Sequence, residues 1–96
     1  MLNIKDLILQ HQSIFCFFNK VYLFGSSLDN KKYLNDIDLL LVYEKYSEQL
    51  VKERKNITSK LEKIFTLHID LTILSETELK ETNFLERLNS PYKRIL

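Results

Sequence analysis

Two apolar segments separated by the chain's only glycine constrain the fold more than any other feature. The first, Val21–Phe24, ends directly before Gly25, and the second, Asp36–Tyr43, follows after a polar stretch. Short runs of branched and aromatic residues bounded by glycine and polar residues are typical of buried strands. The sequence therefore predicts two strands that are joined through a turn at Gly25.

The second of these strands opens with two carboxylates. Successive side chains of a strand point to opposite faces, so Asp36 and Asp38 are expected to project from the same face. They repel each other unless a cation lies between them, and their oxygen atoms suit a divalent metal ion. Gly25 permits close approach of a ligand, and Ser26 can present its hydroxyl and nearby backbone N–H groups to an anion. Together these residues indicate a metal–nucleotide site.

The composition is that of an ordinary globular domain. The 96 residues fit one domain, residues 1–96, and the net charge of +1 gives no support for a general nucleic-acid or membrane-surface binder. Charged residues interrupt the apolar N-terminal segment before it could span a bilayer, so we expect a cytoplasmic protein with no membrane association. The lone Cys16 lies in an apolar segment and is expected to be a buried thiol.

The remaining segments predict alternating helices and strands. Helices are expected over 2–18, with Asn3 as a candidate cap and Asp6 in the first turn, and from about Ser47 to Thr66. The apolar stripe expected on the second helix consists of Leu50, Ile57, Leu61, Ile64 and Phe65.

The C-terminal half completes the predicted fold. His68–Leu74 alternates as a strand does, and Ser75 followed by Glu78 is a capping box for a helix that runs to Leu88. A short edge strand is expected within residues 92–96. The order of elements predicts an α/β (α+β) fold in which helices cover one face of a short mixed sheet.

The third predicted strand carries another aspartate, Asp70. If this strand lies beside the Asp36–Asp38 strand in the right register, the three carboxylates suit two Mg²⁺ ions, which stabilise an in-line displacement at phosphorus. Asp36 and Asp38 would then bind the metals and the triphosphate, and Asp70 would assist deprotonation of the acceptor hydroxyl. The simpler alternative is a set of solvated acids at strand ends. His68 shares the face of Asp70 and is expected to be a partly exposed structural histidine.

The combined pattern resembles a known family. Gly25-Ser26, nine further residues, Asp36-Ile37-Asp38 and then Asp70 on a later strand are similar to the motif of the nucleotidyltransferase superfamily of DNA polymerase β. Within that superfamily the chain resembles the minimal nucleotidyltransferases over nearly its whole length. The resemblance implies a polymerase β-like fold, two Mg²⁺ ions and ATP as substrate. It also implies the site residues, namely Gly25, Ser26 and Ser27 for nucleotide binding and Asp36, Asp38 and Asp70 for catalysis and metal binding.

The resemblance further implies transfer of AMP to a hydroxyl. Several minimal members are antitoxins that adenylylate a tyrosine of a HEPN-type toxin, so such a partner and a hetero-oligomer are expected here. The chain departs from these antitoxins in having Ser27 where an arginine often stands, and in a slightly shorter loop. Lys31 or Lys32 could supply the missing charge. The alternatives are a catalytically inactive module that neutralises a toxin by contact, and transfer to RNA or a small molecule.

Overall fold

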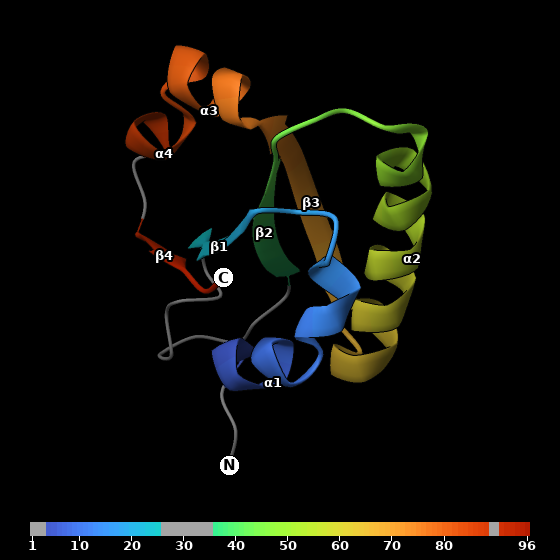
Figure 1. Ribbon diagram of the computed structural model, residues 1–96. Helices are drawn as coiled ribbons and strands as arrows, with labels where there is room; N and C mark the ends of the chain where they lie inside the picture. Colours follow the sequence, from blue (N-terminus) through green and yellow to red (C-terminus); the bar gives the residue numbers. More distant parts are fainter. Residues whose placement is uncertain (1–3, 26–35, 89–90) are drawn as a thin grey trace.

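The structure, a computed structural model, describes residues 4–25, 36–88 and 91–96. Within these residues four strands form one mixed sheet in the order β3-β2-β1-β4 (Figure 1). The inner strand β1 is antiparallel to both of its neighbours, whereas β2 and β3 are parallel. The predicted mixed sheet and α+β class are therefore confirmed. The strands are β1 (Lys20–Phe24), β2 (Asp36–Tyr43), β3 (His68–Ser75) and β4 (Tyr92–Arg94).

Two of the three predicted helices are each divided in two. The first changes to a 3-10 turn after His11, because its backbone leaves helical angles there. The last is interrupted at Asn83, which adopts the left-handed conformation that asparagine tolerates well. In the described ranges no helix is long and apolar enough to cross a membrane. The helical segments are α1 (Ile4–Gln10), η1 (Gln12–Phe15), α2 (Glu48–Phe65), α3 (Glu76–Thr82) and α4 (Phe84–Arg87).

One face of the sheet carries the core. Ile37, Leu39 and Leu41 alternate along β2 and are fully buried. They belong to one apolar cluster with Ile57 and Leu61, two residues of α2. Figure 1 shows α1 and α2 against the sheet on this side. The prediction placed the helices over one face, and α1 and α2 follow it, whereas α3 and α4 lie on the other face.

Two predictions about buried residues are wrong. Ile64 of α2 is 38% exposed, because the stripe continues from Ile57 and Leu61 to Phe65 in steps of four residues and leaves Ile64 at its margin. Cys16 is exposed. It follows directly after the 3-10 turn that buries Phe15, and so it points away from the core.

The opposite face of the sheet is partly covered by the α3–α4 segment. Leu40 and Val42 lie on this face and are fully buried. The predicted capping box that begins α3 is confirmed, since Ser75 accepts a hydrogen bond from the backbone of Glu78 and Glu78 accepts one from Ser75. Glu76 in the first turn of α3 forms a 3.2 Å ion pair with Lys20 at the start of β1. This ion pair links α3, which follows β3, to β1 on the other side of β2.

Candidate active site

The register between β2 and β3 brings the three predicted aspartates to one face of the sheet. Asp38 lies opposite Asp70, and Asp36 lies opposite His68. Residues in register on neighbouring parallel strands project from the same face, and the strands are about 4.8 Å apart. All three aspartates therefore start from adjacent backbone positions, on the face opposite the core.

The surroundings of Asp38 disfavour its charged form. Asp38 is half-buried, whereas Asp36 and Asp70 are exposed. Burial raises the pKa of Asp38 above its ordinary value of 3.8, and the negative charges of Asp70 and Asp36 raise it further, while His68 acts in the opposite direction. A carboxylate disfavoured by burial and by two like charges gains electrostatic stabilisation from a bound cation.

Gly25 packs directly against Asp38. Its φ of 75° lies in the region that favours glycine, and a Cβ atom added there would be 2.6 Å from Asp38 Oδ2. The described group that approaches Gly25 is therefore the Asp38 carboxylate, and contact of this glycine with a ligand stays a prediction. The other predicted nucleotide-binding residues, Ser26 and Ser27, lie outside the described residues, as do Asn3, Lys31 and Lys32.

The donor atoms fit a divalent metal ion in kind, although they are not arranged around a common point. In the part of the chain that the structure describes, no group of three or more His, Cys, Asp or Glu side chains is positioned to hold a metal. Asp38 points its carboxylate toward Gly25. The strands place the three aspartates at neighbouring positions on one face. To meet around one metal ion, their side chains would have to change rotamer. Three carboxylates are suitable ligands for Mg²⁺.

His68 connects the site to helix α2. Its imidazole Nδ1 lies 3.5 Å from Glu62 Oε2, and its side chain is 66% exposed, as predicted for a structural histidine. The same Glu62 oxygen accepts a 3.5 Å hydrogen bond from the backbone N–H of Ile69. Glu62 therefore holds the beginning of β3 in place. The sequence does not indicate this role, because Glu62 is one of several charged residues on the solvent side of α2.

A row of aromatic residues continues from the aspartates across the sheet. Phe24 lies opposite both Asp38 and Tyr92, so the row runs Tyr92, Phe24, Asp38, Asp70 on one face. The ring of Phe84 in α4 packs edge to face on Phe24 with centroids 5.9 Å apart. The sequence did not indicate this arrangement, because it depends on the positions of β4 and α4.

Comparison with known proteins identifies the family. Residues 3–88 match the family described as polymerase beta, nucleotidyltransferase. The fold is similar to the crystal structure of the toxin–antitoxin MntA–HpeT, a variant with two Asp-to-Glu changes, with a TM-score of 0.62 at 16% identity over 99% of this chain and 73% of that chain. Together with the family match, this similarity confirms the predicted polymerase β-like fold.

A second solved structure is that of a protein from Sulfolobus solfataricus assigned as a nucleotidyltransferase. It has 27% identity and a TM-score of 0.48, and covers 80% of this chain and 68% of that chain. No curated protein matches the chain significantly. Because the family match extends over residues 3–88, nearly the whole chain, this protein belongs to the polymerase beta family of nucleotidyltransferases.

Proposed function

We propose that this protein is a Mg²⁺-dependent adenylyltransferase that moves AMP from ATP to a hydroxyl group of a partner protein. The observation that carries the proposal is the register that sets Asp70 opposite Asp38, in a member of a nucleotidyltransferase family. We further propose that residues 1–96 act as one minimal nucleotidyltransferase domain, with Gly25, Ser26 and Ser27 at the phosphates.

The proposed reaction assigns a role to each aspartate. The acceptor oxygen bonds to the α-phosphorus, the bond from that phosphorus to the bridging oxygen breaks, and pyrophosphate leaves. Asp36 and Asp38 bind the metal–triphosphate, and Asp70 assists removal of the acceptor's proton. Two Mg²⁺ ions supply Lewis-acid stabilisation of the attacking and leaving oxygens when they are bound.

A toxin is the proposed partner. The similar structure is described as a toxin–antitoxin pair, and its two substituted aspartates are two positions apart, as Asp36 and Asp38 are. This likeness supports an antitoxin role. We further propose that the protein acts in the cytoplasm, with a tyrosine of a HEPN-type toxin as the acceptor and no direct contact with nucleic acid. The formal net charge of +1 agrees with a protein acceptor rather than RNA.

Intact-mass measurement tests this function. The protein encoded by the neighbouring reading frame is incubated with ATP, Mg²⁺ and this chain, and we expect it to gain the mass of one or more AMP groups. α-Labelled ATP should label the same protein. The Asp36→Asn, Asp38→Asn double variant should give neither signal. Transfer retained by that folded variant would refute the roles assigned to the two aspartates.

The absence of an arginine after Gly25-Ser26 favours a second candidate function. Ser27 offers no positive charge for the phosphates, so the chain could be a catalytically inactive module that neutralises a toxin by contact. In that case neutralisation would survive the double aspartate change, and the partner would gain no mass.

A further inference from the structure

A hollow lies where α3 meets α4, next to the row formed by Tyr92, Phe24, Asp38 and Asp70. Its volume is about 290 Å³, and it is lined by Thr82, Phe84, Arg87 and Leu88. Phe84 connects it to the site, because its ring packs on Phe24, the residue opposite Asp38. One strand spacing of about 4.8 Å and one ring contact with centroids 5.9 Å apart therefore lie between Asp38 and Phe84, which lines the hollow. A nucleotide with its phosphates at the aspartates extends over such a distance through its ribose.

We propose that this hollow binds the base of the nucleotide, an inference that rests on the proposed nucleotidyltransferase function. Phe84 and Leu88 supply apolar walls, and aromatic rings stack on bases of any sequence. Phe84 and Arg87 are three residues apart on α4 and so share one side of the helix. A planar guanidinium both stacks on a base and donates hydrogen bonds to its ring nitrogens and oxygens.

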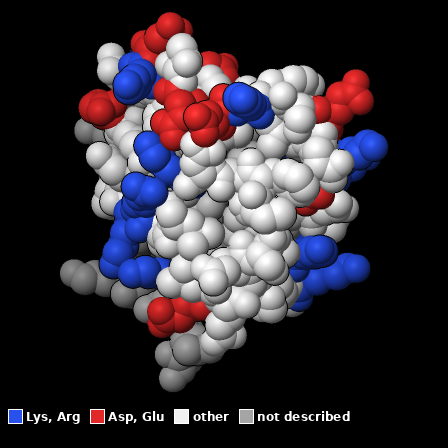
Figure 2. All heavy atoms as spheres, viewed as in Figure 1, with Lys and Arg blue, Asp and Glu red and all other residues white. Residues whose placement is uncertain are grey.

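The side chain of Arg87 is available to contact a nucleotide in the hollow. Arg87 is exposed, and among the described residues it takes part in neither of the two ion pairs. Figure 2 shows Lys and Arg side chains gathered along the margin of the molecule where Figure 1 places β4, whereas acidic side chains cluster above, by α3. An anionic nucleotide is therefore favoured on the β4 side of α4.

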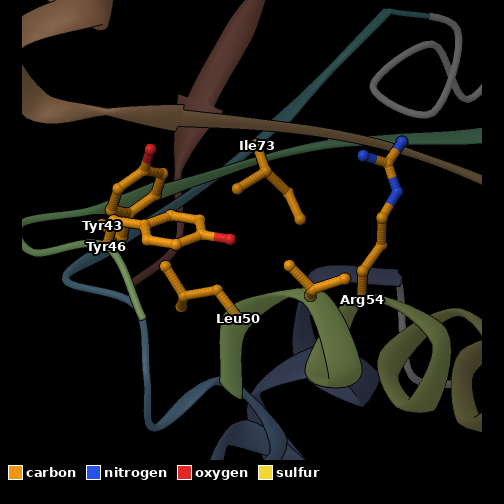
Figure 3. Close-up of a pocket in the computed structure, with 6 residues that line it drawn as sticks. Tyr43, Tyr46, Leu50, Arg54 and Ile73 are labelled. Carbon is orange, nitrogen blue, oxygen red and sulfur yellow. The ribbon is translucent and has the colours of Figure 1, made fainter. Parts of the chain in front are cut away.

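A second cavity contains similar side chains but cannot serve the same ligand. It has a volume of about 230 Å³ and lies between two tyrosines, Tyr43 and Tyr46, and Arg54 (Figure 3). Tyr43 is five residues beyond Asp38 along β2, which is about 16 Å. Because it is an odd number of residues from Asp38, its side chain projects from the opposite face of the sheet. A nucleotide anchored at the aspartates does not reach this cavity.

Titrations with two ligands distinguish the contribution of the base to binding from that of the phosphates. The affinities for ATP and for inorganic triphosphate, each with Mg²⁺, are measured by calorimetry for the wild-type chain and for Arg87→Ala and Phe84→Leu. Loss of a stacking contact should weaken ATP binding roughly tenfold, while triphosphate binding stays unchanged. Lys80→Ala removes a positive charge from α3 outside the hollow and is the matched control, for which both affinities should equal those of the wild type.

Each outcome decides the inference. An equal loss of ATP and triphosphate affinity in Arg87→Ala would show a phosphate contact and overturn it, as would no loss at all. Equal affinity of the wild type for both compounds would also overturn it, because the base would then contribute nothing, yet the proposed function would stand. A wild-type chain that binds neither compound would overturn both.

Photolabelling covers the case in which Phe84→Leu does not fold. Wild-type protein irradiated with 8-azido-ATP and Mg²⁺ should carry the label on the peptide that contains α3 and α4. Unlabelled ATP in excess should prevent this labelling. Label on the peptide that contains Tyr43, Tyr46 and Arg54 would overturn the inference.

Discussion

The two faces of strand β2 are built differently. On one face Ile37, Leu39 and Leu41 are uniformly buried against the α1–α2 side. On the other face two aspartates come first, and Leu40 and Val42, both fully buried, follow. The second face is therefore divided along its length, charged where β2 begins and apolar under α3. This comparison shows that a single strand can give one whole face to the core and only the first part of the other face to a candidate site.

The division arises from where α3 is held. Its first turn is tied to β1 by the ion pair between Glu76 and Lys20, and its capping residue Ser75 ends β3. Because β2 and β3 are parallel, α3 begins at the same end of the sheet as Val42 and Tyr43. The opposite end, where both strands begin, is left for the three aspartates.

The largest effect is expected from substitutions that test whether the buried residues on the two faces of β2 are equally well packed. Leu39→Ala and Leu40→Ala remove fully buried side chains from opposite faces, and each should lower the free energy of unfolding by about 2–5 kcal/mol. Urea denaturation followed by circular dichroism measures both. Val51→Ala, at a position 61% exposed, is the control with little expected effect. A much smaller loss for Leu40→Ala would mean that α3 covers its face only loosely.

A smaller loss of stability is expected at Gly25. Gly25→Ala places a residue with a Cβ atom at a φ of 75°, which should cost roughly 1–3 kcal/mol. It should also displace the Asp38 carboxylate and weaken Mg²⁺ binding, measured by calorimetry. Gly25→Asn separates the two effects, since asparagine tolerates this φ but still carries the Cβ atom. If Gly25→Asn restored both stability and Mg²⁺ binding, contact with Asp38 would not be the cause.

The cap of α3 should contribute less again. Ser75→Ala removes the hydroxyl that accepts a 3.0 Å hydrogen bond from the backbone N–H of Glu78, and thermal unfolding should show a loss of about 1 kcal/mol. Ser47 is the matched control, because it precedes α2 without a side-chain cap hydrogen bond, so Ser47→Ala should change little. Equal effects of the two substitutions would argue against a specific role of the α3 cap.

The smallest expected effect concerns the charge on Asp38. Its pKa is raised in the folded protein above the ordinary value of 3.8, so the folded state binds this proton more tightly than the unfolded chain does. Stability from this group is therefore lost as pH rises from 3.8 through the raised folded pKa. Asp38→Asn should raise Tm at neutral pH, and the gain should shrink as pH falls toward 4. A gain of the same size at every pH would contradict this account.

Local sequence patterns predicted the long elements well. The bounds of β2 agree with the prediction, α2 begins and ends within one residue of it, and the Ser75–Glu78 capping box is present. The shorter helical segments were predicted less well, since the breaks at His11 and Asn83 were missed. Helices this short are held mostly by tertiary packing rather than by their own sequence.

The sequence by itself determined that Asp36 and Asp38 share a face, because alternation along a strand is local geometry. Only the tertiary structure decided that Asp70 lies opposite Asp38, and that Phe24 and Tyr92 continue the same row. Pairing between distant strands is selected by burial of their apolar faces, and a shift of one residue would turn Asp70 toward the core. That selection depends on the whole sheet and its helices, so no single segment of the sequence contains it.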